Sequence, residues 1–185
     1  MFENDITITG AHATKLKYIN EQLEVFPRYV DVYMAAALVG ALNKKTAPKS
    51  NDSTDRARIY ADVLIRENEK IRKIFKTVIL TDATKNWSNE EKINICFKYR
   101  EKKNESKYLT VTDEEINKMK EALDLFDSYV LAGIDILYDE FTSGKTVLTV
   151  NEVIDKEFDM VKAQKITIEA KDKSYDDSQL LRQEF

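Results

Sequence analysis

The sequence predicts an all-α fold, a single-domain helical bundle of about six to seven helices with a minor β pairing between short segments near the two termini. Four Gly and two Pro among 185 residues are too few turn formers for a sandwich or barrel of many strands. Apolar residues also recur at helical spacing along most of the chain. We expect a helical domain over residues 1–164 and a C-terminal tail over residues 165–185 that is mobile or bound to a partner.

The first helices are predicted on either side of a proline. A helical period starts at Ala11 and runs toward Pro27, because the residue before a proline disfavours helical geometry. Residues 27–43 are apolar nearly all round, which is typical of a helix in the middle of a bundle. Pro27 fits the first position of that central helix, where its missing N–H costs nothing.

The later helices are indicated by periodicity and by their start signals. Residues 56–64 fit either a helix or a strand, whereas residues 67–80 keep a helical period. The spacing Ser/Thr-x-x-Glu, in which side chains satisfy the N–H groups of a first helical turn, occurs at Ser88 with Glu91, Thr112 with Glu115 and Thr149 with Glu152. The second of these opens the longest helix, of about 30 residues, which we expect to end before a cap at Gly144.

Two pairs of small residues predict a close helix crossing. Ala36 and Gly40 are one turn apart in the central helix, and Ala132 and Gly133 lie in the longest helix. A helical Gly costs roughly 1 kcal/mol, which a close approach of two backbones would offset. We therefore expect these two helices to pack against each other.

Short strands are predicted at both ends of the chain. Residues 5–9, DITIT, alternate apolar and polar side chains. Ile166 and Ile168 show the same alternation, and we expect them to pair with Ile6 and Ile8.

The composition limits the class of protein. A formal net charge of −4 argues against a protein that coats nucleic acid through bulk positive charge, although it is compatible with a local basic patch. The single cysteine, Cys96, excludes an intrachain disulfide and a cysteine-based zinc site. The first ten residues lack the apolar core of a signal peptide, and the apolar run over residues 32–42 is too short to span a bilayer. We expect a cytoplasmic protein without a membrane partner.

No residue pattern identifies a reaction, so we expect no catalytic residues, cofactor or bound metal. Residues 142–146, TSGKT, contain the end of a phosphate-binding loop, but Asp139 stands where that loop requires its first glycine, and a helix cap is the preferred interpretation. The only histidine, His12, has no carboxylate or nucleophile indicated near it by spacing, so we expect it on the surface. Cys96 lies on an apolar helical face and is expected to be a buried structural thiol.

Four aspartates lie along the longest helix: Asp124, Asp127, Asp135 and Asp139. Asp135 and Asp139 share a face and have the oxygen ligands that a divalent cation prefers. Because that face carries no histidine, we interpret the four as a solvated stripe.

Two basic groups are candidate contacts to nucleic-acid phosphates. The first follows the central helix and consists of Lys44, Lys45 and Lys49, where cations near a helix C-terminus are favourable in any case. The second consists of Lys70, Arg72, Lys73 and Lys76, and the neighbouring Glu67 and Glu69 dilute its charge. An ordinary solvated surface is the alternative interpretation for both groups.

Two blocks of small and aromatic residues carry a family resemblance. The first block comprises Phe26, Tyr29, Asp31, Val32, Ala35, Ala36, Ala37 and Gly40, followed by Lys44 and Lys45; the second comprises Phe126, Tyr129, Ala132, Gly133 and Leu137. With middle helices over residues 71–80 and 88–97, this order resembles the small helical proteins encoded beside DNA phosphorothioation (Dnd-type) modification and restriction genes. The resemblance covers about residues 26–154. It implies an accessory role in bacterial defence against foreign DNA and partners within the modification or restriction machinery, and it implies no active-site residues.

The first functional hypothesis is a non-enzymatic accessory or adaptor protein of a prokaryotic DNA-modification or anti-phage defence system, acting through protein–protein contacts. In the tail, Leu180, Leu181 and Phe185 are candidate partner-binding residues. The alternative is a DNA-binding module that uses the basic patch after the central helix. A third hypothesis is a metal-dependent enzyme that uses Asp135 and Asp139.

Overall fold

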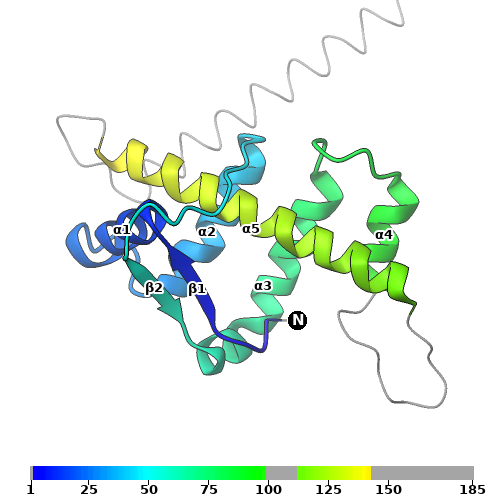
Figure 1. The fold of residues 1–185 in the computed structure, drawn as a ribbon, viewed down its shortest axis with the longest axis horizontal. Coiled ribbons are helices and arrows are strands. Elements are labelled where there is room, and N and C mark those ends of the chain that lie inside the picture. Colours follow the sequence, from blue (N-terminus) through cyan, green and yellow to red (C-terminus); the bar gives the residue numbers. More distant parts are fainter. Residues whose placement is uncertain (1, 99–111, 143–185) are drawn as a thin grey trace, which may run out of the picture. The chain divides into compact units, whose positions relative to one another are not determined.

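The computed structural model describes residues 2–98 and 112–142, all of which lie in the first of the chain's two units, Met1–Val147 and Leu148–Phe185. The described elements, in chain order, are β1 (Ile6–Thr9), α1 (Ala11–Lys17), a π-helical segment (Tyr18–Gln22), α2 (Tyr29–Leu42), β2 (Arg56–Ile59), α3 (Ala61–Thr81), α4 (Asn89–Phe97) and α5 (Asp113–Thr142). These ranges are mostly helical and contain one two-stranded antiparallel sheet (Figure 1). Their five α-helices are slightly fewer than predicted. The helix predicted from Thr149 and the predicted boundary after residue 164 lie outside the described residues.

Helices α2 and α5 cross with their backbones in contact, and Figure 1 shows α5 running across α2. A Cβ added at Gly133 would overlap the carbonyl oxygen of Ala36, and one added at Gly40 would overlap the carbonyl oxygen of Tyr129. Ala132, the neighbour of Gly133 in α5, is also buried. The predicted close crossing is therefore confirmed, and neither glycine position leaves room for a side chain.

An aromatic cluster joins α3 to the two crossed helices. Phe126 of α5 lies against Tyr33 of α2 and Phe75 of α3, with ring centroids 5.9 and 5.5 Å apart in edge-to-face arrangement. All three rings are at most 1% exposed. Such pairs contribute about 0.5–1.5 kcal/mol beyond the area they bury. The cluster fixes α3 to the core through the apolar stripe that its sequence predicted.

Strands β1 and β2 form an antiparallel ribbon in which Ile6 lies opposite Ile59 and Thr9 lies opposite Arg56. The strand predicted over residues 5–9 is thus confirmed. Residues 56–64, which fitted either a helix or a strand, contain both, because Tyr60 is extended and α3 begins directly after it. The pairing predicted for residues 166–168 lies outside the described residues.

Each strand leads directly into a helix, and an aspartate from elsewhere in the sequence caps that helix. Asp5, just before β1, accepts a hydrogen bond from the Ala61 N–H at the start of α3 at 2.7 Å. Asp52, shortly before β2, accepts one from the Ala11 N–H at the start of α1 at 2.9 Å. Such carboxylates satisfy N–H groups that have no partner inside a helix. Asp5 therefore links the start of α3 to the segment before β1, and Asp52 links the start of α1 to the segment before β2.

The start of α2 differs from the prediction. Arg28 has an extended backbone, with φ −143° and ψ 151°, and the helix begins at Tyr29, so Pro27 lies outside it. The guanidinium of Arg28 reaches the first turn, where Nη2 lies 2.7 Å from Oδ1 of Asp31 and Nε lies 2.9 Å from Oδ2. This two-pronged pair holds Arg28 outside the helix, which moves the helix start two residues beyond the proline.

The start signals of α4 and α5 are confirmed. Ser88 Oγ accepts from the Glu91 N–H at 3.2 Å while Glu91 accepts from the Ser88 N–H at 2.9 Å. Thr112 and Glu115 form the same reciprocal bonds at 3.2 and 2.8 Å. The cap predicted at Gly144 lies outside the described residues. Although α5 has 30 residues, neither it nor another helix in the described ranges is long and apolar enough to cross a membrane.

Candidate functional site

Helices α3 and α4 form an antiparallel hairpin whose register is set at both ends of α4. Near its start, Lys92 donates a hydrogen bond to the carbonyl oxygen of Asp82, the residue that follows α3. Near its end, the Cys96 thiol lies 3.8 Å from the carbonyl oxygen of Lys76. The end of α4 therefore lies beside Lys76, in the C-terminal part of α3, and Figure 1 shows the loop that turns the chain from α3 back into α4.

Three large apolar side chains are exposed on this hairpin. Leu80 is 39% exposed, Ile93 is 47% exposed and Phe97 is 62% exposed. Ile93 and Phe97 are one turn apart on α4, and Lys76 places its Nζ 4.2 Å from the centre of the Phe97 ring, within range of a cation–π interaction. With Lys73 one turn before Lys76, we call these five residues the α3–α4 face.

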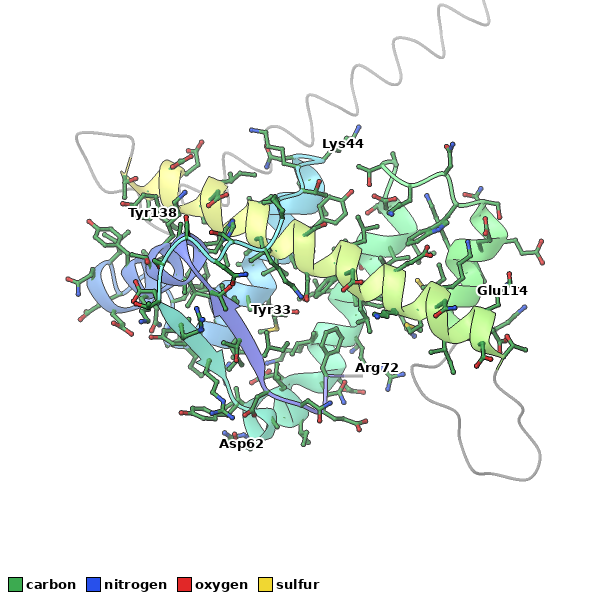
Figure 2. All side chains as sticks on the ribbon, in the orientation of Figure 1. Tyr33, Lys44, Asp62, Arg72, Glu114 and Tyr138 are labelled. Carbon is green, nitrogen blue, oxygen red and sulfur yellow. The ribbon has the colours of Figure 1, made fainter. Side chains whose placement is uncertain are left out.

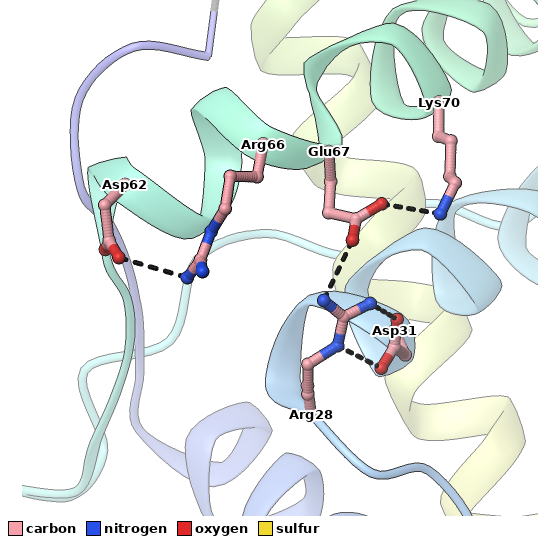
Figure 3. A network of polar contacts seen from close by, with 6 residues as sticks. All are labelled: Arg28, Asp31, Asp62, Arg66, Glu67 and Lys70. Atoms are coloured by element: carbon pink, nitrogen blue, oxygen red, sulfur yellow. Dashed lines mark hydrogen bonds and ion pairs between the residues drawn. The ribbon is translucent and has the colours of Figure 1, made fainter.

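Lys70 of the second basic group does not contribute free charge. Its Nζ lies 2.7 Å from Oε2 of Glu67, and the other oxygen of Glu67 lies 2.8 Å from the guanidinium of Arg28, which also binds Asp31 (Figure 3). The carboxylates therefore balance the cations in this network. It fastens the start of α2 to α3.

The other members of that group remain available. Arg72 and Lys73 are exposed, and Lys76 is half-buried beside Phe97. No ion pair of residues 2–98 and 112–142 includes these three cations. They give this side of α3 a positive charge next to the exposed apolar residues.

The first basic group is also divided. Lys49 lies 3.3 Å from Oδ2 of Asp127 and is paired. Lys44 and Lys45 are exposed at the end of α2, where Lys44 has a left-handed backbone with φ 53°. Figure 2 places Lys44 and Arg72 far apart on the molecule. The two predicted basic groups therefore do not form one surface.

The prediction of a surface position for His12 is wrong. Its side chain is buried, with 6% of the residue exposed, and Nε2 lies 3.3 Å from Oδ2 of Asp135. Lys15 binds the other oxygen of that carboxylate at 2.8 Å. Nδ1 of His12 is buried without a hydrogen-bond partner in the described part of the chain. The reason is that α1 packs the face carrying His12 and Leu16 against α5, a contact that residue spacing does not reveal.

The interpretation of the α5 aspartates as a solvated stripe holds only for Asp124 and Asp139, which are exposed. Asp135 is bound by α1, and Asp127 accepts a hydrogen bond from the buried Tyr33 hydroxyl at 3.2 Å. Burial raises the pKa of Asp127, although the nearby Lys49 opposes the shift. In the described ranges, no three His, Cys, Asp or Glu side chains converge as metal ligands.

The prediction for Cys96 is confirmed. The residue is 7% exposed, and burial raises the pKa of its thiol to about 11. The reactive thiolate is therefore scarce at neutral pH, which fits a structural role.

Comparisons with protein-family models, with curated proteins and with solved structures found no match for this chain. The roles of its residues therefore rest on geometry and chemistry. The candidate partner-binding residues Leu180, Leu181 and Phe185 lie outside the described residues, as do the last four residues of the TSGKT segment.

Sequence reasoning missed the exposure of the α4 side chains. The apolar face expected around Cys96 is only partly buried: Ile95 and Cys96 are buried, whereas Ile93 and Phe97 are exposed. The signal lay in the nine-residue helix itself, because apolar residues at positions 93, 95, 96 and 97 surround it. A short helix at the edge of a bundle buries one side only.

Proposed function

We propose that this chain is a non-enzymatic adaptor protein that binds a partner protein through the α3–α4 face. The observation that carries the proposal is the exposure of Leu80, Ile93 and Phe97 together on one helical hairpin. Contiguous apolar surface on a folded protein commonly marks an interaction site. Covering it removes apolar area from water, which favours association by about 25 cal/mol per Å² before the costs of ordering.

The charge beside the face specifies the chemistry of the partner. Arg72, Lys73 and Lys76 favour a partner that surrounds its apolar contact with carboxylates. Complementary charge of this kind raises the association rate and suppresses wrong partners, and both effects weaken as salt rises.

The biological setting comes from the sequence resemblance to proteins encoded beside DNA phosphorothioation genes. It suggests that the partner belongs to a prokaryotic DNA-modification or anti-phage defence complex. An adaptor in such a complex needs a stable scaffold and a contact surface, and it needs no reaction centre of its own.

Co-purification tests this proposal directly. A tagged full-length chain is expressed with the products of the genes that flank its own, and the double variant Ile93→Ser/Phe97→Ser is compared with the unaltered chain. We expect the double variant to lose its partner. Tyr60→Ser/Ile65→Ser is the matched control, since those residues are 57% and 55% exposed but lie at the start of α3. Equal recovery of the partner with the Ile93/Phe97 variant would contradict the proposal.

A second candidate function, contact with DNA, is favoured by the outer face of the ribbon. Arg56 and Arg58 alternate on β2 with buried residues, and Thr9 and Thr7 lie opposite them on β1. Two-stranded ribbons with polar outer faces can enter the major groove, where Arg pairs with guanine. Asp5 binds the guanidinium of Arg58, so Arg56 is the better placed of the two arginines. This site differs from the basic patch that the sequence suggested.

Salt dependence distinguishes this second function. Binding of the full-length chain to a duplex oligonucleotide is measured across a range of salt concentrations for the unaltered chain, Arg56→Ala and Lys44→Ala. If the ribbon contacts a phosphate or base, Arg56→Ala weakens binding and Lys44→Ala does not. The opposite pattern would favour the patch after α2, and absence of salt-sensitive binding would exclude both.

A further inference from the structure

The outer edge of β1 carries backbone groups that the ribbon leaves unpaired. The Gly10 N–H donates to the Asp55 carbonyl at 3.1 Å, and these residues lie opposite each other in the ribbon register. Hydrogen-bonded and non-hydrogen-bonded pairs alternate along an antiparallel ladder. Ile6 and Ile8 therefore direct their backbone groups toward β2, and Thr7 directs its N–H and C=O away from it. In the described ranges the sheet has no third strand.

A groove of about 360 Å³ runs along this edge. One wall is β1 itself, from Asp5 to Thr9, and the opposite wall is formed by Asp127, Val130 and Leu131 of α5. The segment over residues 49–51 closes one end, where Thr9 Oγ1 donates to the Ser50 carbonyl at 2.6 Å. The groove thus combines a strand edge with two carboxylates, Asp5 and Asp127, and with the buried apolar residues Val130 and Leu131.

Asp127 is the charged group of the far wall. Its side chain is 33% exposed and is held by Tyr33 from the core side and by Lys49 from the solvent side. The Lys49 side chain is 67% exposed, and its Nζ lies 3.3 Å from the carboxylate. Because the Lys49 side of this pair lies in solvent, holding its ammonium group there contributes little, and a cation brought by a ligand can take its place against the carboxylate.

We propose that the β1 edge groove binds an extended peptide segment that pairs with Thr7 through its backbone and places a lysine or arginine against Asp127. An added strand satisfies an open sheet edge with main-chain hydrogen bonds, while side chains on alternate positions provide specificity. Side chains of such a segment that face Val130 and Leu131 are apolar. This inference does not depend on the α3–α4 face. It concerns a second contact, in the groove between β1 and α5.

The probe is a capped nine-residue peptide of alternating Val and Thr with a central Lys, added to the full-length chain. Binding is followed by fluorescence anisotropy and by the amide NMR signals of Thr7 and Thr9. Two further peptides carry N-methyl groups. One is methylated at the amides of the odd-numbered residues and the other at the amides of the even-numbered residues, which point to opposite edges of the strand. Because only one set faces β1, we expect one methylated peptide to bind at least tenfold more weakly and the other to bind like the parent.

Charge is tested in the same format. We expect a peptide with a central Glu to bind at least tenfold more weakly than the Lys peptide, and Asp127→Asn to remove most of that difference. Asp124→Asn, on an exposed residue of the same helix, should leave it unchanged. Equal binding of both methylated peptides, or unmoved Thr7 signals at millimolar peptide, would overturn the proposal. The proposal would also be overturned if no peptide bound and the Thr7 amide hydrogen exchanged slowly with solvent. That result would show that another part of the chain already covers the β1 edge.

Discussion

The α2–α5 crossing and the α3–α4 face use side chains in opposite ways. At the crossing, Gly40 and Gly133 have no side chains, and the backbones of two helices touch. At the face, Ile93 and Phe97 carry large apolar groups that remain 47% and 62% exposed to solvent. The difference separates the scaffold from the surface that we propose binds a partner. Substitutions at the crossing should therefore change stability, and substitutions at the face should change binding.

The largest effect is expected from Gly133→Ala. Alanine is the better helix former by about 1 kcal/mol, but its Cβ would overlap the Ala36 carbonyl, and overpacking of this kind costs about 3 kcal/mol or more. The free energy of unfolding in urea measures the loss. The reverse change at a half-buried position of α2, Ala41→Gly, should cost only about 1 kcal/mol. If Gly133→Ala were the milder of the two, the backbones would not be in contact.

Tyr129→Phe tests how the crossing is joined to the α3–α4 hairpin. The Tyr129 hydroxyl donates to Oδ1 of the buried Asp82 at 2.5 Å, and its loss should cost about 1–3 kcal/mol. Tyr138→Phe, on the same helix, serves as the control and should have little effect. Thermal unfolding of both variants at neutral pH gives the comparison.

The same variant should change the acid sensitivity of the protein. Burial alone would raise the pKa of Asp82, but the hydrogen bonds from Tyr129, Thr84 and the Lys85 N–H outweigh it, and the net pKa is lowered from 3.8. A carboxyl with a lowered pKa stabilises the fold above that value and loses this contribution as the pH falls. Tyr129→Phe should therefore lose less stability between pH 5 and about pH 3 than the unaltered chain. An unchanged slope would show that Tyr129 does not act on Asp82.

A smaller effect is expected from Asp5→Ala, which removes the cap of α3. The Ala61 N–H, followed by Arg58, lowers the pKa of Asp5, so its contribution is present at neutral pH and is lost as the pH falls below 3.8. We expect the melting temperature to drop by a few degrees at pH 7 and by less at pH 3. Asp62→Ala, in the first turn of the same helix but paired only with the exposed Arg66, should change it less.

Asp127→Asn should have little effect or a slight stabilising one. Burial raises the pKa of this carboxyl, so the folded state disfavours its ionised form and loses stability as the pH rises through that pKa. Asparagine keeps an acceptor for the Tyr33 hydroxyl and carries no charge. The free energy of unfolding at pH 7 should rise by less than about 1 kcal/mol, and its pH dependence above pH 3.8 should flatten. A clear loss of stability would show that the Lys49 pair outweighs the burial.

Sequence patterns predicted the crossing because small residues in apolar helices have one common use, which is close packing. The helix starts at Ser88 and Thr112 could also be predicted, since two residues three positions apart carry the whole signal. The burial of His12 and the caps from Asp5 and Asp52 could not be predicted, because each joins residues more than 40 positions apart and, unlike the paired glycines, shows no recurring residue pattern. The α3–α4 face depends on which side of a short helix meets the core, and that choice is made by the packing of α3 and α5.

The most direct test of the division between scaffold and contact surface is the free energy of unfolding of Ile93→Ser/Phe97→Ser. These side chains are already 47% and 62% exposed, so urea unfolding should give a value within about 0.5 kcal/mol of the unaltered chain, with the same dependence on urea concentration. A loss of about 2 kcal/mol or more would mean that the two residues belong to the folded core, and the α3–α4 face would not be a surface kept for a partner.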